Sequence, residues 1–162
     1  MILIALGSNQ NGRWGNPREA VSEALKRLNT GGIRLRRSSR LLVSAPFGVT
    51  GQPDFVNAVA EVETSLPPGA LLKRLHHIER MGGRKRTLRW GPRTLDLDLI
   101  DYHGLVMPRP ARPVLPHPGI AERIFVLAPL AEIAPRWRHP VSRLTAAAML
   151  ARLDQAGDGR LL

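Results

Sequence analysis

The sequence contains no cysteine among its 162 residues. This absence excludes disulfide bonds, thiolate metal sites and cysteine nucleophiles. No apolar run approaches the roughly 18 residues that a membrane-spanning helix needs, and the apolar stretch at residues 1–6 lacks the charged flank of a signal peptide. We therefore expect a cytoplasmic protein with no membrane partner and enough apolar residues for a core of its own.

Acidic residues are also scarce, because 13 Asp and Glu stand against 24 Lys and Arg, for a net charge of +11. A basic surface attracts phosphate-bearing partners. Only three of the cations are lysines, however, and an excess of arginine can follow from coding bias alone. The local pattern is more informative: residues 84–93 hold five cations and no acid, which indicates a segment suited to phosphate groups.

The chain lacks the G-x-x-x-x-G-K-[ST] loop that cradles phosphates in many nucleotide-binding proteins. A nucleotide would therefore be held by metal ions and guanidinium groups. Asp96 and Asp98 follow directly after the basic segment. On a strand over residues 94–101 their carboxylates share one face, and the leucines at positions 95, 97 and 99 pack on the other.

Two adjacent carboxylates repel each other unless a cation lies between them, and hard divalent cations that bridge phosphate oxygens suit that position. The pattern thus favours a phosphoryl-transfer site. The alternative is that Asp96 and Asp98 form the solvated face of an ordinary antiparallel strand. The preceding Trp-Gly-Pro-Arg at residues 90–93 favours the site, because a bulky aromatic and a cation beside a turn are unusual on a plain surface.

Periodicity and breaker residues predict the order of the elements. One helix should begin after Asn16, which forms a capping box with Glu19, and a second should run from residue 67 to Gly82-Gly83. Gly7-Ser8-Asn9 is expected to be a turn. Four strands are expected, at residues 2–6, 33–44, 55–63 and 94–101. The order β-α-β-β-α-β indicates an α+β fold with a ferredoxin-like core and an antiparallel sheet.

The last third of the chain should extend this core. Residues 108–118 contain five prolines and are expected to form an extended loop. Appended C-terminal helices are expected at 124–133 and 144–153, the second capped by Ser142, before a frayed tail at 155–162. With neither repeat nor linker, residues 1–154 are expected to form a single domain.

The predicted topology also brings segments together. In a ferredoxin-like sheet the first and third strands are central and the second and fourth lie at the edges. The loop at 45–53 and the basic segment at 84–93 are then predicted to converge on one end of the sheet, with the proline-rich loop close to the strand of the two aspartates.

The run R-W-G-P-R-T-L-D-L-D-L-I at residues 89–100 resembles the signature of the 6-hydroxymethyl-7,8-dihydropterin pyrophosphokinases of folate biosynthesis. Four shorter segments match the family in order, at residues 5–9, 51–57, 116–117 and 123–125. The resemblance implies a ferredoxin-like fold and a transfer of pyrophosphate from ATP to the hydroxymethyl group of the pterin, with two Mg²⁺ ions and release of AMP. It also implies small-molecule substrates, no nucleic-acid partner and a monomer.

The resemblance assigns roles residue by residue. Asp96 and Asp98 match the magnesium ligands, and Arg84 and Arg93 match catalytic arginines that neutralise charge on the transferred group. Asn57 matches the residue whose side-chain amide recognises the pterin edge. Phe55 and Phe125 match the two positions whose aromatic rings sandwich the pterin ring. The implied pterin-binding residues are Ser44, Ala45, Phe47, Phe55, Asn57, Trp90 and Phe125. The implied ATP-binding residues are Leu72, Glu79, Arg86, Leu99, Arg112, His117 and Arg123.

Some positions depart from the family pattern. Phe55 stands where some relatives have Tyr, the run Ser-Ala-Pro-Phe at 44–47 replaces a more usual Thr-Pro-Pro-Leu, and His76 stands where Gln occurs. The segment at 10–16 is longer than in some relatives. None of these positions is a predicted metal ligand or catalytic arginine.

Two other classes of function compete with this interpretation. An RNA-recognition module shares the ferredoxin-like fold and would fit the charge, but it stacks bases on an aromatic-rich segment, and aromatics make up only 4% of this chain. A two-metal nuclease would need three or more clustered acids and a base that activates water. Taken alone, Phe55 and Phe125 would be interpreted as core residues.

Overall fold

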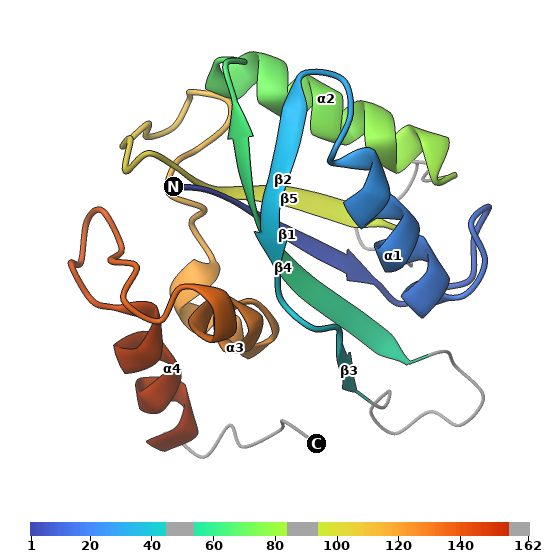
Figure 1. Ribbon diagram of the computed structural model, residues 1–162. Helices are drawn as coiled ribbons and strands as arrows, with labels where there is room; N and C mark the ends of the chain where they lie inside the picture. Colours follow the sequence, from blue (N-terminus) through green and yellow to red (C-terminus); the bar gives the residue numbers. More distant parts are fainter. Residues whose placement is uncertain (45–53, 84–93, 156–162) are drawn as a thin grey trace.

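The computed structural model describes residues 1–44, 54–83 and 94–155. The described elements follow one another as shown in Figure 1: β1 Ile2–Ser8, α1 Pro17–Arg27, β2 Ile33–Ser38, β3 Leu42–Ser44, β4 Phe55–Thr64, α2 Pro68–Met81, β5 Asp96–Tyr102, the short 3₁₀ helix η1 Ile120–Glu122, α3 Ile124–Ile133 and α4 Ala146–Gln155. None of the helices described in these ranges is both long and apolar enough to cross a membrane.

The sheet confirms the predicted α+β topology. Its strands lie in the order β2-β4-β1-β5, all neighbours are antiparallel, and β3 pairs with β4 beyond the end of β2. The first and third predicted strands, β1 and β4, are therefore central. Gly7 of β1 is paired with Asn57 of β4 on one side and Asp96 of β5 on the other, so the start of β4 and the start of β5 meet at the end of β1.

Two strand predictions need correction. Gly7 and Ser8 belong to β1 rather than to a turn, because β4 pairs with both residues and β5 pairs with Gly7. The strand expected at 33–44 is split into β2 and β3. Between them, the Ser39 N–H donates to the Val59 carbonyl (2.8 Å) and the Ser39 hydroxyl accepts from the Val59 N–H (3.0 Å). The side-chain oxygen thus replaces a backbone acceptor and interrupts the ladder.

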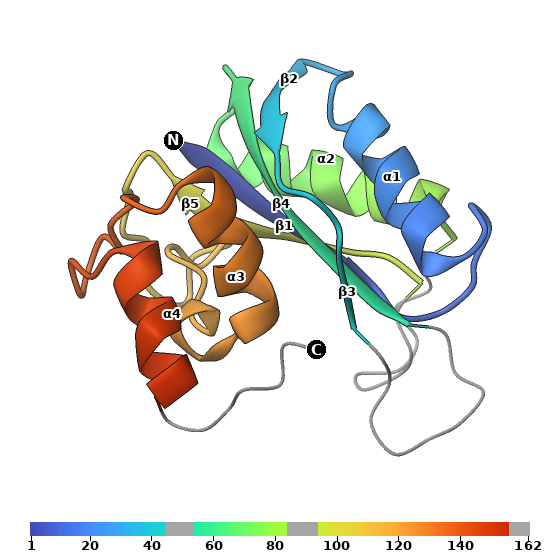
Figure 2. The ribbon, with the colours of Figure 1, turned by 60° about the horizontal axis from the view of Figure 1, so that its bottom comes forward.

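The two faces of the sheet are covered differently, as Figures 1 and 2 show. Helices α1 and α2 lie on one face, where the larger apolar core gathers alternate residues of β1, β4 and β5. Helix α1 begins as predicted, since the side chain of Asn16 accepts from the Glu19 N–H while Glu19 binds the Asn16 N–H. Helices α3 and α4 pack on the opposite face, over Leu3, Ala5 and Val59.

The α3–α4 layer is fixed to the sheet by a buried polar contact. The Trp137 indole N–H donates to Asp101 Oδ2 at 2.8 Å, and the other Asp101 oxygen accepts from the Gly104 N–H at 3.1 Å. Trp137 and Asp101 are only 7% and 3% exposed. The contact joins the segment between α3 and α4 to the end of β5, and so holds the layer that forms one wall of the site described below.

The start of α4 also differs from the prediction. The helix begins at Ala146, and the Thr145 hydroxyl accepts from the Ala148 N–H (3.1 Å), so Thr145 is the capping residue. Ser142 instead accepts from the Leu144 N–H within the preceding turn. Gln155, expected in the tail, is the last residue of α4, and residues 156–162 lie outside the described part of the chain.

We expect Trp137→Phe to destabilise the protein by about 1–3 kcal/mol, because the buried Asp101 loses a donor while the aromatic packing is largely kept. Urea unfolding followed by circular dichroism measures this change. Val141→Ala is the control in the same segment, since Val141 is 63% exposed and should change the free energy of unfolding by less than about 0.5 kcal/mol. Equal stability of Trp137→Phe and wild type would contradict a role for the contact.

Candidate functional site

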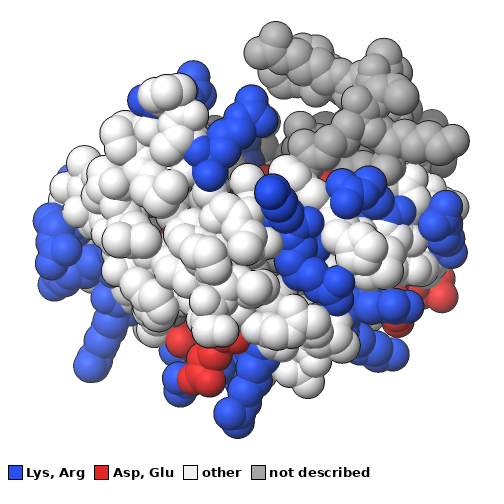
Figure 3. Space-filling view, turned by 90° about the horizontal axis from the view of Figure 1, so that it is seen from above, with Lys and Arg blue, Asp and Glu red and all other residues white. Residues whose placement is uncertain are grey.

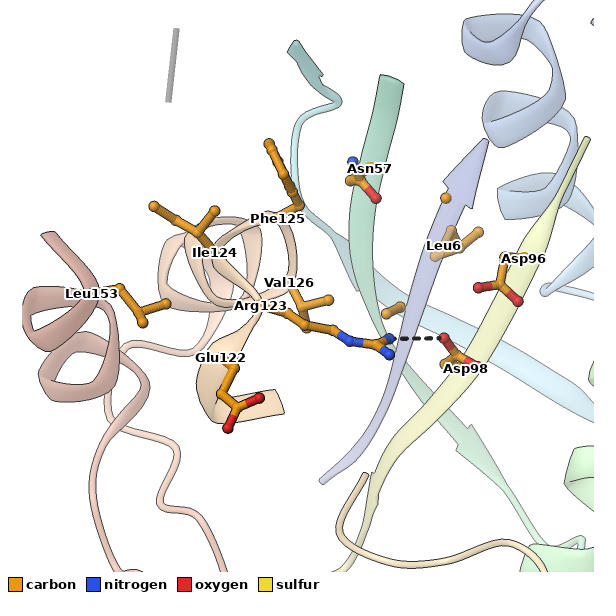
Figure 4. A pocket seen from close by; sticks show the side chains of 12 residues that line it. Leu6, Asn57, Asp96, Asp98, Glu122, Arg123, Ile124, Phe125, Val126 and Leu153 are labelled. Carbon is orange, nitrogen blue, oxygen red and sulfur yellow. Dashed lines mark ion pairs between the residues drawn. The ribbon is translucent and has the colours of Figure 1, made fainter. Parts of the chain in front are cut away.

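Asp96 and Asp98 stand on the same face of β5, as their spacing predicted. Figure 4 shows both side chains projecting from β5 toward the space beside β1 and the start of α3. The leucines between and beside them at positions 95, 97 and 99 are at most 3% exposed and belong to the core under α1 and α2. The strand thus buries its apolar face and turns two carboxylates toward the opposite side.

A pocket of about 370 Å³ opens on that side. Asp96 and Asp98 line one wall, Asn57 comes from β4, and Phe125 and Arg123 come from the start of α3. Its rim reaches α4 through Leu153. An aromatic face, an amide and two carboxylates therefore converge around one space, as expected for a flat polar ligand that carries a reactive group.

A second pocket of about 610 Å³ lies on the other side of Asp98, under the proline-rich loop. Leu72 comes from α2, Leu99 from β5, and Arg112 and His117 from the loop. These four predicted ATP-binding residues are thus brought together. Asp98 lines both pockets, so the two pockets share one carboxylate as part of their walls.

The loop reaches this position by returning along β5. It leaves the strand at the end remote from Asp96, and the His117 N–H then donates to the Ile100 carbonyl (3.0 Å). The prediction that the proline-rich loop lies close to the strand of the aspartates is therefore confirmed, and the contact runs along the strand edge that β1 leaves free.

The electrostatics of Asp98 are unusual. Burial, followed by the charge of Asp96, raises the pKa of Asp98 to about 7, and the Arg123 guanidinium, 3.8 Å away, offsets part of this effect. The side chain is still 32% exposed, so a ligand can reach it. A divalent cation between the two carboxylates would remove the repulsion that raises this pKa.

The donor set suits Mg²⁺ that is shared with a substrate. Among residues 1–44, 54–83 and 94–155 there is no group of three or more His, Cys, Asp or Glu that could hold a metal ion. The protein thus offers two carboxylates at this site, and phosphate oxygens and water would have to supply the other ligands. Magnesium ions at phosphoryl-transfer sites are usually bound in this way.

His117 is oriented by its own loop. The Gly119 N–H donates to its Nδ1 (3.1 Å), so the neutral ring carries its proton on Nε2, and that atom lies 3.9 Å from Asp98 Oδ2. Burial, and next the charge of Arg123, lowers the pKa of His117. The lowered pKa favours the neutral ring, whose Nε2 then presents a hydrogen-bond donor in the second pocket beside Asp98.

Glu79, a predicted ATP contact, is placed behind the carboxylates. It is 1% exposed on α2, and its Oε1 accepts from the Leu97 N–H (3.2 Å), between Asp96 and Asp98. It lines neither of the two pockets. The structure therefore gives Glu79 a direct part in holding β5, and its charge also contributes to the raised pKa of Asp98.

Phe55 lies beside the first pocket. It lines an adjoining hollow of about 140 Å³ that shares Gly7, Asn57 and Asp96 with the larger pocket, so Phe55 and Phe125 contribute to neighbouring spaces on the site face. Ser44 is opposite Phe55 in the ladder, and its buried hydroxyl has no hydrogen-bond partner among the described residues.

Six predicted site residues lie outside the described part of the chain: Ala45, Phe47, Arg84, Arg86, Trp90 and Arg93. The residues that flank the two segments are placed. Ser44 pairs with Phe55, and the Ser8 hydroxyl donates to the Thr94 carbonyl (2.6 Å), both at the end of β1. The attachment points agree with the predicted convergence, which itself stays a prediction.

Sequence reasoning missed several residues that line the pockets. Ile124 and Leu153 meet in the first pocket only because α4 packs on α3, and the sequence carries no signal for that arrangement. Arg109 lines the second pocket beside Arg112. Its position in the proline-rich loop next to a predicted ATP residue is a signal that could have suggested it.

Comparison with known proteins agrees with this geometry. Residues 3–135 match the family model described as 7,8-dihydro-6-hydroxymethylpterin-pyrophosphokinase. The chain belongs to this family. It is therefore a pyrophosphokinase that transfers pyrophosphate from ATP to the hydroxymethyl group of the dihydropterin in folate synthesis.

The relatives include single enzymes and longer proteins. The chain is 44% identical over 145 residues to the 2-amino-4-hydroxy-6-hydroxymethyldihydropteridine pyrophosphokinase of Pseudomonas aeruginosa, covering 88% of this chain and 85% of that one. It is 44% identical over 132 residues to the mitochondrial folate synthesis bifunctional protein of Arabidopsis thaliana, covering 82% of this chain but 23% of that protein. The fold also matches a crystal structure of Plasmodium falciparum HPPK-DHPS, with a TM-score of 0.70 at 12% identity over 99% of this chain and 45% of that one.

The raised pKa of Asp98 predicts a pH-dependent stability. A carboxyl whose folded-state pKa is raised binds a proton more tightly when folded, so its contribution to stability falls as pH rises from 3.8 toward about 7. We expect Asp98→Asn to melt at a higher temperature than wild type near pH 8, and with a much smaller difference near pH 5. Thermal unfolding of the ligand-free proteins at the two pH values tests this. The same difference at both pH values would contradict the assignment.

Proposed function

We propose that the first pocket binds the pterin, the second binds ATP, and Asp96 and Asp98 hold two Mg²⁺ ions where the pockets meet. The observation that carries the proposal is that Asp98 lines both pockets. A phosphate chain that extends from the nucleotide pocket past Asp98 would present its phosphorus atoms to a hydroxyl in the other pocket. When bound, the magnesium ions would neutralise the phosphate oxygens and hold them against the carboxylates.

Four described side chains have parts in the proposed reaction. Asn57 and the ring of Phe125 orient the pterin, and His117 donates to a phosphate oxygen through Nε2. The hydroxymethyl oxygen attacks the β-phosphorus, the bond from that phosphorus to the oxygen bridging the α-phosphorus breaks, and AMP leaves while the hydroxyl proton passes to solvent. Arg123 beside Asp98 stabilises the charge on the transferred group. Arg84 and Arg93, outside the described residues, are proposed to do the same.

The charge of the surface suits anionic substrates. On the face shown in Figure 3, Lys and Arg side chains cross the centre of the view and continue to its right side, and others stand at the left and lower edges. Such an excess of cations attracts phosphate-bearing ligands. We propose further that the protein acts in the cytoplasm as a monomer, with residues 1–154 as one domain.

Replacing either aspartate tests the metal assignment. Asp96→Asn and Asp98→Asn keep the side-chain shape but remove the charge, so we expect turnover to fall by at least about 100-fold with the fold intact. Purified protein is incubated with ATP, Mg²⁺ and the reduced pterin, and AMP is separated from ADP. Glu132→Gln is the control, because Glu132 pairs with Arg40 away from both pockets. Normal AMP formation by both variants would refute the site.

A second variant tests the nucleotide pocket. Arg112→Ala removes a cation from that pocket alone, so we expect KM for ATP to rise by roughly tenfold with a smaller change in kcat and in pterin affinity. Arg136→Ala is the matched control, since Arg136 is an exposed arginine beyond the end of α3. A change confined to pterin affinity would show that the two pockets are assigned the wrong way round.

A further inference from the structure

Gly7 lines the first pocket between Asn57 and Asp96. It lies near the end of β1 and is the cross-strand partner of both Asn57 and Asp96. It lines the pocket of about 370 Å³ and also the adjoining hollow that contains Phe55. Figure 4 shows Asn57 on β4 and Asp96 on β5 on either side of β1, so the backbone of Gly7 separates the amide from the first carboxylate.

A side chain at this position would displace the Asn57 amide. A Cβ atom at residue 7 would lie 2.9 Å from Asn57 Oδ1, closer than real Cβ contacts, whereas the next backbone atom, the Val56 carbonyl oxygen, would be 3.9 Å away. Gly7 is not among the described glycines with positive φ. Its backbone is ordinary strand, and the need for glycine therefore comes from the contact with the Asn57 amide rather than from conformational freedom.

Neighbouring strands flank the Asn57 amide on both sides. It lies between two partners in the ladder, Leu42 of β3 and Gly7 of β1. Cross-strand side chains stand about 5 Å apart, so the Leu42 side chain occupies the space on one side and only Gly7 leaves space on the other. Asparagine is also uncommon within strands, which calls for a specific use of this amide.

We propose that Gly7 is a positioning residue, whose missing side chain lets the Asn57 amide lie against β1 and keeps the pocket floor flat for a planar ring. The inference rests on the proposed pterin site. A methyl group at this position would push the Asn57 amide toward the space of the ring and would rise from the floor between Asn57 and Asp96. Gly7 thereby selects for a thin heterocycle without touching the nucleotide pocket, which it does not line.

The test is a double-mutant cycle on ligand affinity. Gly7→Ala, Asn57→Ala and the double variant are titrated with 6-hydroxymethylpterin, in the presence and absence of a nonhydrolysable ATP analogue and Mg²⁺. We expect Gly7→Ala to weaken pterin binding by roughly tenfold and the analogue by less than about twofold. In the Asn57→Ala background the same methyl group meets no amide, so Gly7→Ala should weaken pterin binding by less than about threefold there.

Control variants distinguish a specific effect of Gly7→Ala from a general effect of replacing a glycine. Gly69→Ala is the matched glycine substitution, because its Cβ would meet only the Arg112 carbonyl oxygen at 3.9 Å, and it should leave pterin affinity unchanged. If Gly7→Ala lowers the melting temperature, the double variant should restore it, since it removes the clash. Equal losses in both backgrounds, or no loss in Gly7→Ala, would overturn the inference. A wild-type protein that binds no pterin would instead refute the proposed function.

Discussion

The repulsion between two carboxylates on one strand face is the constraint on which the site depends. The period of two in a β-strand puts Asp96 and Asp98 side by side, and their separation cannot be relaxed without exposing the leucines packed beneath α1 and α2. The core thus holds the two charges together. Burial is the main cause of the raised pKa of Asp98, and the charge of Asp96 adds to it; cations shared with a phosphate chain would offset that charge.

The antiparallel sheet explains why the other groups of the site lie where they do. Because β4 and β5 both run opposite to β1, their first residues meet at the end of β1. Asn57 and Asp96 come from these beginnings, although 38 residues of sequence separate them. Helix α3 contributes Phe125 and Arg123 from its own beginning, and the proline-rich loop contributes His117 by pairing with the free edge of β5. The site is thus formed by residues at the ends of strands and helices, while the central residues of the same elements form the core.

The sequence predicted what depends on local pattern. The spacing of Asp96 and Asp98, the capping box at Asn16 and, apart from the split of the second strand, the β-α-β-β-α-β order were confirmed, because each rests on residues close together in the chain. The failures depend on tertiary contacts. Nothing near Ser39 in the sequence indicates that its hydroxyl replaces a backbone acceptor, and nothing near Leu153 indicates that α4 places it in the first pocket. The sequence favoured Ser142 as the cap of α4 because it lies near the expected start of the helix. In the structure α4 begins at Ala146, and Thr145 is the capping residue.

The position of Glu79 adds to the electrostatic conflict. This third acid is buried on α2 and binds the backbone between the two aspartates, so it stabilises the strand while its charge disfavours ionisation of Asp98. A neutral glutamine could accept the same hydrogen bond without that effect. Arg123, 3.8 Å from Asp98, offsets part of this effect on the pKa of Asp98. A cation bound beside Asp98 would favour its ionised form, so magnesium binding and loss of the Asp98 proton would be linked.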